Sequence, residues 1–200
     1  VSSNMVANIG ELQNRGLEIN LNVSARKTMN FSWDFNFNLS RVTTTVNSLS
    51  GNGYSIGDNG EISIGYFPDA GGCSSHGVNL VQEGAPLGQI QGPVYTGVVQ
   101  NGQPTHMDLN GDGYYCDCQD DFAVLGNALP KFAFGFGNRF LYKDFELSFL
   151  LRGAIGHHKV NAYRIYQEAT GSAGWTNLIE TPYFNAALTT THLSSNYVEK

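Results

Sequence analysis

Residues 30–40 read NFSWDFNFNLS and place a large apolar side chain at every second position. The apolar members are Phe31, Trp33, Phe35, Phe37 and Leu39. Because successive side chains of an extended chain point to opposite faces, the pattern predicts a strand with one aromatic face and one polar face. A tilted strand needs about 9–11 residues to cross a bilayer, and this stretch is long enough. The question is therefore whether the aromatic face contacts a protein core or lipid.

Two predicted hairpins share this design. Residues 17–24 alternate in the same way before a short polar turn at 26–28, so residues 16–41 are predicted to form the first β-hairpin. Alternation restarts in KFAFGFGNR at residues 131–139 and continues through residues 145–152 after a turn at 142–144. Residues 131–152 are therefore predicted to form the second β-hairpin.

The connection between the hairpins is rich in Gly, Asn and Ser and much longer than the loops of compact domains. Outer-membrane barrels combine long extracellular loops with short periplasmic turns, so residues 43–130 are predicted to be a long extracellular loop. Residues 153–200 are predicted to be a loop that leads to a further strand, with helical turns at 160–168. Because about four strands cannot close a barrel, we expect a fragment of a transmembrane antiparallel β-barrel in an all-β fold.

The amino-acid composition fits a sheet with one polar, solvent-exposed face and one apolar face. Charged residues make up 14% of the chain, below the roughly 25% of soluble domains, while Gly, Phe and Tyr number 24, 12 and 10. The formal net charge of -6 argues against nucleic acid or an anionic membrane surface as partner, because both are bound through clustered Lys and Arg. No signal peptide is visible from Val1 onward, and no apolar run reaches the 18 residues that predict a transmembrane helix.

A candidate calcium loop lies at residues 108–113, DLNGDG, where oxygen ligands at alternate positions and a glycine at the sharp turn match the first half of a calcium-binding loop. The candidate metal residues are Asp108, Asn110, Asp112, Tyr114 and Asp120. The second half departs from the pattern, because position 12 is Gln119 rather than a carboxylate. The alternative is an Asp/Asn/Gly turn that satisfies its own backbone, and calcium is the only cofactor considered.

No catalytic constellation is found in the sequence. The chain has three cysteines, Cys73, Cys116 and Cys118. One disulfide, from Cys73 to either of the others, would leave one free thiol, and no metal is expected at these thiols. The adjacent histidines at 157 and 158 point apart on an extended chain. The charged residues Glu18, Asp34, Glu146 and Arg152 fall on the polar faces of their strands, where they are explained as the lining of a wet interior. We therefore expect a protein that is not an enzyme.

Several short motifs resemble one family in their order and approximate spacing. They are NIG (8–10), NRGLE (14–18), EGAPLG (83–88), DLNGDG (108–113), GNALPKF (126–132) and LYKDFELS (141–148). Together they resemble the C-terminal half of the barrel of SusC/RagA-type TonB-dependent outer-membrane transporters. The stretch at 114–119 departs from the family, which places an acid soon after the DLNGDG segment, and this puts any inherited cation site in doubt.

The resemblance implies a barrel of about 22 strands in the outer membrane, filled by an N-terminal plug that these residues do not contain. It also implies import driven through TonB, and a SusD-like surface lipoprotein that closes over the barrel. In this hypothesis the aromatic faces contact the lipid bilayer, and the substrate is an oligosaccharide or a peptide. The candidate residues for stacking on a substrate are Tyr54, Tyr66, Tyr95 and Trp175.

An alternative hypothesis is a soluble extracellular β-sandwich, such as an adhesin module, with a calcium-stabilised loop and aromatic faces packed on each other. A sandwich of this size needs strands at a regular spacing of about 8–12 residues. The gap between the two hairpins breaks that spacing, which favours the transporter.

Overall fold

The computed structural model describes residues 10–51, 54–57, 60–65, 77–115, 119–170, 178–190 and 194–200. These residues form two compact units. The hairpin unit comprises Gln13–Thr44 and Leu129–His157. The loop unit comprises Val1–Leu12, Thr45–Ala128 and His158–Lys200.

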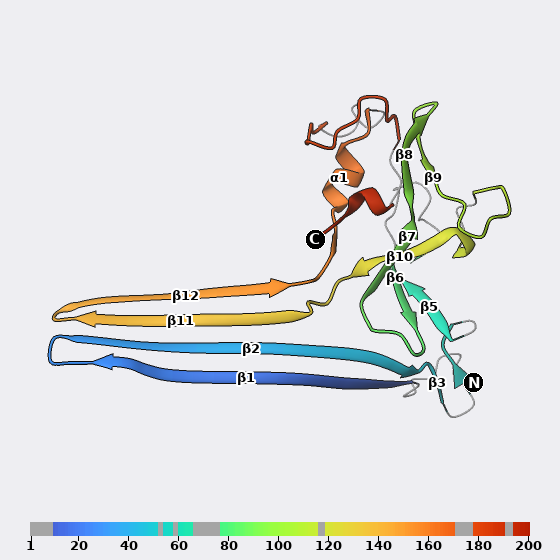
Figure 1. The fold of residues 1–200 in the computed structure, drawn as a ribbon. Coiled ribbons are helices and arrows are strands. Elements are labelled where there is room, and N and C mark those ends of the chain that lie inside the picture. Colours follow the sequence, from blue (N-terminus) through green and yellow to red (C-terminus); the bar gives the residue numbers. More distant parts are fainter. Residues whose placement is uncertain are drawn as a thin grey trace, which may run out of the picture. The chain divides into compact units, whose positions relative to one another are not determined.

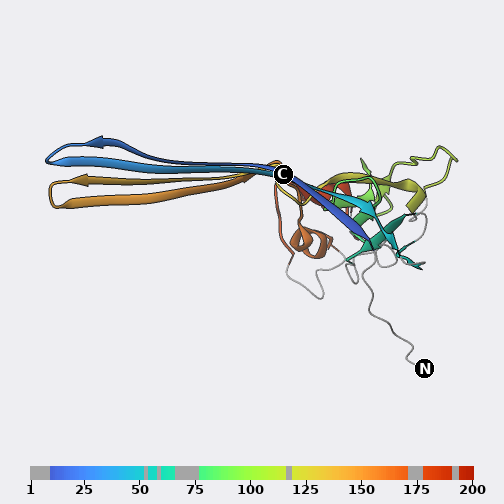
Figure 2. The same ribbon diagram turned by 90° about the horizontal axis from the view of Figure 1, so that it is seen from below.

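The hairpin unit is a four-stranded antiparallel sheet in the order β1-β2-β11-β12 (Figures 1 and 2). The strands are β1 (Glu11–Lys27), β2 (Phe31–Ser48), β11 (Phe132–Tyr142) and β12 (Phe145–Ile155). They correspond to the hairpins predicted at 16–41 and 131–152, and each hairpin runs beyond its predicted limits. The two short turns lie side by side, because the N–H of Lys143 donates to the carbonyl of Asn30 at 2.9 Å.

The strand register separates the two faces of this sheet. Phe37 pairs with Phe136 and Trp33 pairs with Phe140, so the aromatic residues of β2 and β11 share one face. The rings contact one another: Trp33 stacks on Phe140 with centroids 5.5 Å apart, and Phe35 meets Phe136 edge-on at 5.8 Å. Each such contact stabilises the fold by about 0.5–1.5 kcal/mol, in addition to the free energy gained by burying the apolar surface of the rings.

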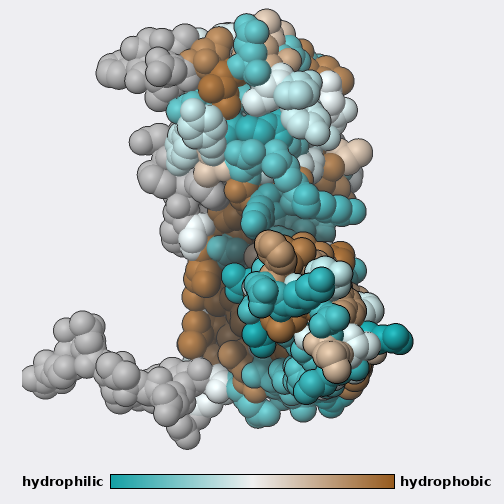
Figure 3. Space-filling view, turned by 90° about the vertical axis from the view of Figure 1, so that its left-hand side faces the viewer, coloured by the Kyte–Doolittle hydropathy of each residue, from teal (hydrophilic) through white to brown (hydrophobic). Residues whose placement is uncertain are grey.

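The apolar face of the sheet is largely exposed within the hairpin unit. Its exposed members include Leu17, Ile19, Leu21, Tyr142, Phe145, Leu147, Phe149, Leu151 and Ile155. Figure 3, seen from the end with the hairpin turns, shows hydrophobic side chains gathered on one side of the sheet. A contiguous exposed apolar face of this kind marks a surface that contacts a partner or a membrane.

The loop unit contains a second antiparallel sheet, in the order β10-β7-β6-β5 (Figure 1). Its strands are β5 (Glu61–Ile64), β6 (Asn79–Gln82), β7 (Gln89–Pro93) and β10 (Phe122–Asn127). A hairpin of β8 (Tyr95–Gln100) and β9 (Gln103–His106) follows β7, and β3 (Ser50–Gly51) pairs with β4 (Tyr54–Ser55). The described residues of the long connection predicted at 43–130 thus contain regular strands.

The core of the loop unit joins this sheet to the C-terminal residues. Val78 and Ile90 pack with Ile165 of helix α1 (Ala162–Gln167) and Tyr197 of the 3-10 helix η3 (Ser195–Tyr197). The Asn161 side chain caps α1 by accepting the Arg164 N–H at 3.2 Å, which explains where the helix begins. Strands β13 (Lys159–Val160) and β14 (Val198–Glu199) pair beside it. Among the residues described, no helix has the length and apolar character needed to span a membrane.

Candidate functional site

The polar face of the hairpin unit is built from asparagines that lie across glycines. Gly137 pairs with Asn36, and Gly135 pairs with Asn38. A Cβ atom at Gly137 would lie 2.6 Å from Nδ2 of Asn36, and one at Gly135 would lie 2.8 Å from Nδ2 of Asn38. The two glycines therefore leave space for both amides, which form a row of neutral hydrogen-bonding groups on this face.

Charged groups on this face are paired across strands. The Ser24 hydroxyl donates to Asp34 at 2.5 Å. Arg139 forms a two-bond ion pair with Glu146, with Nε–Oε1 at 2.8 Å and Nη2–Oε2 at 3.1 Å. Both partners are about half exposed, so water and salt screen the pair and it contributes little to stability. Its position on a wet face agrees with the expected lining of a polar interior.

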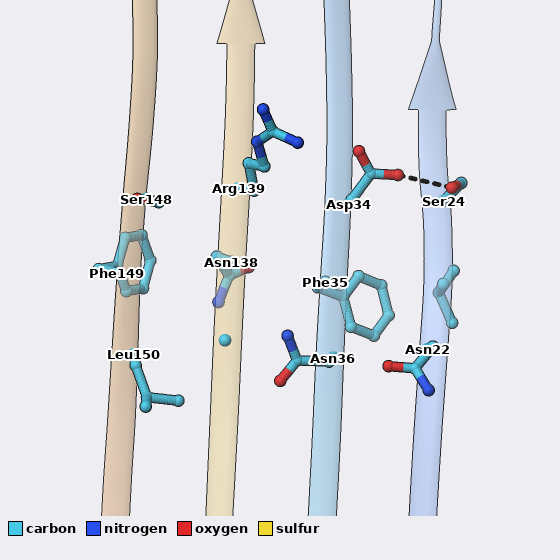
Figure 4. Close-up of a pocket in the computed structure, with 12 residues that line it drawn as sticks. Asn22, Ser24, Asp34, Phe35, Asn36, Asn138, Arg139, Ser148, Phe149 and Leu150 are labelled. Carbon is cyan, nitrogen blue, oxygen red and sulfur yellow. Dashed lines mark hydrogen bonds between the residues drawn. The ribbon is translucent and has the colours of Figure 1, made fainter.

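These groups surround a hollow of about 760 Å³ (Figure 4). The polar side chains that line it are Asn22, Ser24, Asp34, Asn36, Arg139 and Ser148. Figure 4 shows Asp34 reaching from β2 toward Ser24 on β1. The lining offers donors and acceptors with its charges partly paired, which suits contact with water, a polar substrate or another polar protein surface.

The candidate calcium loop uses its carboxylates to bind its own backbone. Asp108 accepts the N–H groups of Gly111 and Gly113, each at 2.7 Å. Asp112 accepts the Tyr114 N–H at 2.8 Å. These are the contacts expected of an Asp/Asn/Gly turn that satisfies its own polar groups.

Asp121 rather than Asp120 points into this loop. Asp121 is fully buried and accepts the Leu109 N–H at 2.8 Å, whereas Asp120 is exposed. The Tyr114 side chain is 73% exposed. The part of the chain that the structure describes contains no group of three or more His, Cys, Asp or Glu residues arranged to hold a metal ion. Calcium binding at Asp108, Asn110 and Asp112 therefore stays a prediction.

The substrate candidates chosen from the sequence are scattered. Tyr95 begins β8, where its N–H donates to the Ser195 hydroxyl at 3.0 Å. Tyr54 belongs to β4, and only its backbone is described. Tyr66, Trp175 and the cysteines Cys73, Cys116 and Cys118 lie outside the described residues.

A cluster centred on Arg164 was missed by the sequence analysis. The guanidinium bonds Glu168 through Nε at 2.7 Å, and through Nη1 it bonds Glu199 and the carbonyl of Asn196, both at 3.0 Å. Its Cζ lies 4.6 Å from the centroid of the Tyr183 ring and 5.2 Å from that of Tyr197. The spacing of Arg164 and Glu168 on a predicted helix was the available signal, because residues four apart are neighbours on a helix surface.

Burial and charge perturb two groups of this cluster. Burial lowers the pKa of Arg164, but the hydrogen bonds and charges of Glu168 and Glu199 outweigh it and raise that pKa above its ordinary value. Burial, helped by the charge of Glu168, raises the pKa of Tyr197 to about 12. Arg164 is therefore a permanent cation and Tyr197 a neutral phenol at physiological pH. A hollow of about 430 Å³ adjoins the cluster.

Known proteins resemble this chain throughout most of its length, although no protein-family model matches it. TonB-dependent receptor P26 of Formosa agariphila is 30% identical over 173 residues, which is 80% of this chain and 16% of the relative. TonB-dependent receptor P3 of the same organism is 26% identical over 190 residues, 87% of this chain and 18% of the relative. TonB-dependent receptor SusC of Bacteroides thetaiotaomicron is 28% identical over 163 residues, 78% of this chain and 15% of the relative.

The chain is similar in sequence to TonB-dependent receptors, SusC among them.

Solved structures agree on the fold of this chain. The RagAB peptide transporter superposes with a TM-score of 0.66 at 13% identity, over 96% of this chain and 22% of the other. The RagAB peptide importer in its "open-open" state superposes with a TM-score of 0.58 at 14% identity, over 90% of this chain and 20% of the other. The expected fold, part of an antiparallel β-barrel, is thereby confirmed, and the β-sandwich alternative is not supported.

The chain spans less than a fifth of the length of the curated relatives that it matches. Those relatives are receptors, which agrees with the expectation that the protein is not an enzyme.

Proposed function

We propose that the protein imports a nutrient through the outer membrane, and that this segment supplies part of the barrel wall and an extracellular substructure. The observation that carries the proposal is the two-faced sheet of the hairpin unit. Its exposed aromatic and aliphatic face suits lipid, and its asparagine-rich face suits a wet lumen. Neither face carries groups arranged for making or breaking bonds.

The orientation proposed for the segment follows from loop length. The turns at residues 28–30 and 143–144 are short and face the periplasm, whereas the loop unit lies outside the cell, because outer-membrane barrels place long connections there. An epitope inserted after Gly111 should be accessible to antibody on intact cells, and one inserted after Lys143 should become accessible only after lysis. The opposite labelling would overturn this orientation.

The proposed partners are a SusD-like surface lipoprotein and TonB, the second reached through parts of the protein outside this segment. The proposed cargo is an oligosaccharide or a peptide. The SusC-type relatives and the peptide-transporting RagAB structures support partners and cargo of this kind.

Import is tested by deleting the gene and measuring uptake of labelled oligosaccharides and peptides by whole cells. We expect uptake of one substrate to be lost on deletion, restored by the intact gene and abolished by dissipating the proton gradient. Co-purification of a surface lipoprotein with the tagged receptor is the second expected result. Unchanged uptake of every substrate in the deletion strain would contradict the proposal.

A further inference from the structure

A row of aromatic side chains ends the apolar face of the hairpin unit beside its two short turns. Tyr142 lies between Phe31 and Phe145 in the strand register. Tyr142 is 55% exposed although β11 has a neighbouring strand on each side. Aromatic rings gather at the level where the lipid-facing surface of an outer-membrane barrel meets the lipid headgroups.

Lys143 places an ammonium group over this row. Its Nζ lies 5.6 Å from the centroid of the Tyr142 ring, within the range of a cation–π contact. The N–H of Lys143 donates to the Asn30 carbonyl at 2.9 Å, so the neighbouring hairpin holds the residue in place. The backbone φ of Lys143 is 51°, in the left-handed region that glycine adopts without strain and lysine seldom adopts. The needs of the turn therefore do not account for a lysine at this position.

A second lysine lies at the other end of the same row. Odd-numbered positions of β1 carry its apolar residues, and Lys27 is the last of these positions. Lys27 lies opposite Phe31 in the register indicated by two side-chain bonds between β1 and β2, Ser24–Asp34 and Asn14–Thr44. Both lysines are exposed, so two ammonium groups are available beside the aromatic rings.

The opposite end of the same face carries a matching contact. The Cζ atom of Arg41 lies 5.5 Å from the centroid of the Phe132 ring. Phe132 and Tyr142 are the two ends of β11, which is 11 residues long. At about 3.3 Å per residue and a tilt of about 40°, the strand rises about 25 Å between them, which is the height of the apolar band of outer-membrane barrels. The two cation–aromatic contacts therefore have the spacing of the two headgroup layers.

We propose that Lys27 and Lys143 bind the phosphate group of a glycerophospholipid in the periplasmic leaflet of the outer membrane, with Tyr142 as the ring beneath it. The ammonium groups complement the charge of the phosphate, and long lysine side chains keep their charged ends in the polar layer while their stems lie on apolar surface. The acyl chains pack on exposed apolar residues farther along β12, Leu147 and Phe149. The site rests on the proposed membrane position and orientation of the segment.

The charge of this end of the sheet is opposite to that of the whole chain. The chain has a formal net charge of -6, whereas the two turns and the adjoining strand ends carry Arg26, Lys27 and Lys143 against one acid, Asp144. Salt screens exposed charges beyond about 8–10 Å, so nearby groups decide how a phosphate is attracted. The overall charge argues against a broad contact with an anionic surface, but a single phosphate at this end of the sheet is favoured.

The test uses the intact receptor, purified in detergent, and compares phosphatidylglycerol with a diacylglycerol of the same acyl chains, which lacks the phosphate. Circular dichroism follows the thermal unfolding midpoint as each lipid is titrated, which gives an apparent affinity. Phosphatidylglycerol should raise the midpoint, and diacylglycerol should not. The double variant Lys27→Gln/Lys143→Gly should bind phosphatidylglycerol more weakly, by about fivefold for each lysine removed.

Control variants separate loss of the site from loss of folding. Lys143→Gly suits the left-handed backbone, so the unfolding midpoint without lipid should not fall in that variant. Arg152→Gln removes an exposed cation from the polar face, opposite Gly135, and should leave lipid binding unchanged. The double variant Lys27→Arg/Lys143→Arg keeps both charges and should retain binding.

Equal midpoint shifts with phosphatidylglycerol and diacylglycerol would overturn the phosphate as the recognised group. Unchanged affinity in Lys27→Gln/Lys143→Gly, or an equal loss in Arg152→Gln, would overturn the site. Inorganic phosphate that raises the midpoint as far as phosphatidylglycerol does would overturn the lipid as the ligand. None of these results contradicts import itself, which fails only if uptake survives deletion of the gene.

Discussion

Asn138 is a polar residue placed on the apolar face of the hairpin unit. It pairs with Phe35 on one side and Phe149 on the other, and it is only 6% exposed. Its Oδ1 accepts the indole N–H of Trp33 at 3.1 Å, while its Nδ2 has no hydrogen-bond partner. The alternation of residues 131–139 places Asn138 on this face, but its bond to Trp33 depends on the pairing of β2 with β11, which no local pattern supplies.

The bond between Trp33 and Asn138 predicts a non-additive pair of substitutions. Asn138→Leu should destabilise the folded receptor by about 1–3 kcal/mol, because the Trp33 N–H loses its acceptor in apolar surroundings. The double variant Trp33→Phe/Asn138→Leu should recover most of that loss, since neither polar group then remains unpaired. Urea unfolding in lipid vesicles measures both, with Trp33→Phe alone as the control. Additive losses would show that the bond does not stabilise the wall.

Neighbouring residues of β2 predict opposite responses to charge. If the proposed membrane position holds, Phe35→Arg should destabilise the inserted barrel by roughly 2–4 kcal/mol near the bilayer midplane, whereas Asn36→Arg, on the polar face of the sheet, should assemble normally. Recovery of folded barrel in outer-membrane fractions measures assembly. Equal damage from the two variants would contradict the assignment of faces.

At the scale of elements, the sequence predicted strands that carry a period of two and missed strands that do not. β2 and β11 alternate strictly, so both were found. β7 reads QIQGP and is buried at four of its five positions, so its fold depends on contacts with β6 and β10 rather than on any alternation. The Arg164 cluster was missed for the same reason: α1 was predicted, but its contacts with η3 and β14 join residues more than 30 positions apart.

The turn at residues 108–114 predicts which acid holds the loop in place. Asp121→Ala should loosen it strongly, because a buried carboxylate accepts the Leu109 N–H, whereas the exposed Asp120 can be replaced by Ala with little effect. Limited proteolysis of the purified receptor measures the difference. If calcium binds the loop, adding a chelator should make the unmodified receptor easier to cleave. The chelator should have a smaller effect on Asp108→Ala and Asp112→Ala, which would already have lost a ligand. Cleavage unaffected by the chelator would leave the backbone-satisfied turn as the full explanation.

At the scale of the whole molecule, the sheet of the hairpin unit has two open edges. The strand order gives β1 and β12 one neighbour each, and they are 17 and 11 residues long. Edge strands of this length expose unpaired N–H and C=O groups, which a closed barrel would satisfy with further strands. The apolar face of the same sheet is exposed as well. Neither the edges nor the apolar face is buried by the other described residues of the hairpin unit, as is expected of a piece of barrel wall.

Residues 1–200 expressed alone should therefore fail to give a stable monomer in detergent-free buffer. We expect self-association through the open edges and the apolar face, with no cooperative thermal unfolding, because about four wall strands cannot bury either feature among themselves. Light scattering after size-exclusion chromatography measures the association, and circular dichroism measures the unfolding transition. The intact receptor in detergent is the control and should unfold cooperatively at high temperature. A monodisperse segment that unfolds cooperatively without detergent would show that the apolar face packs within the segment itself, which would remove the main physical reason for placing it against lipid.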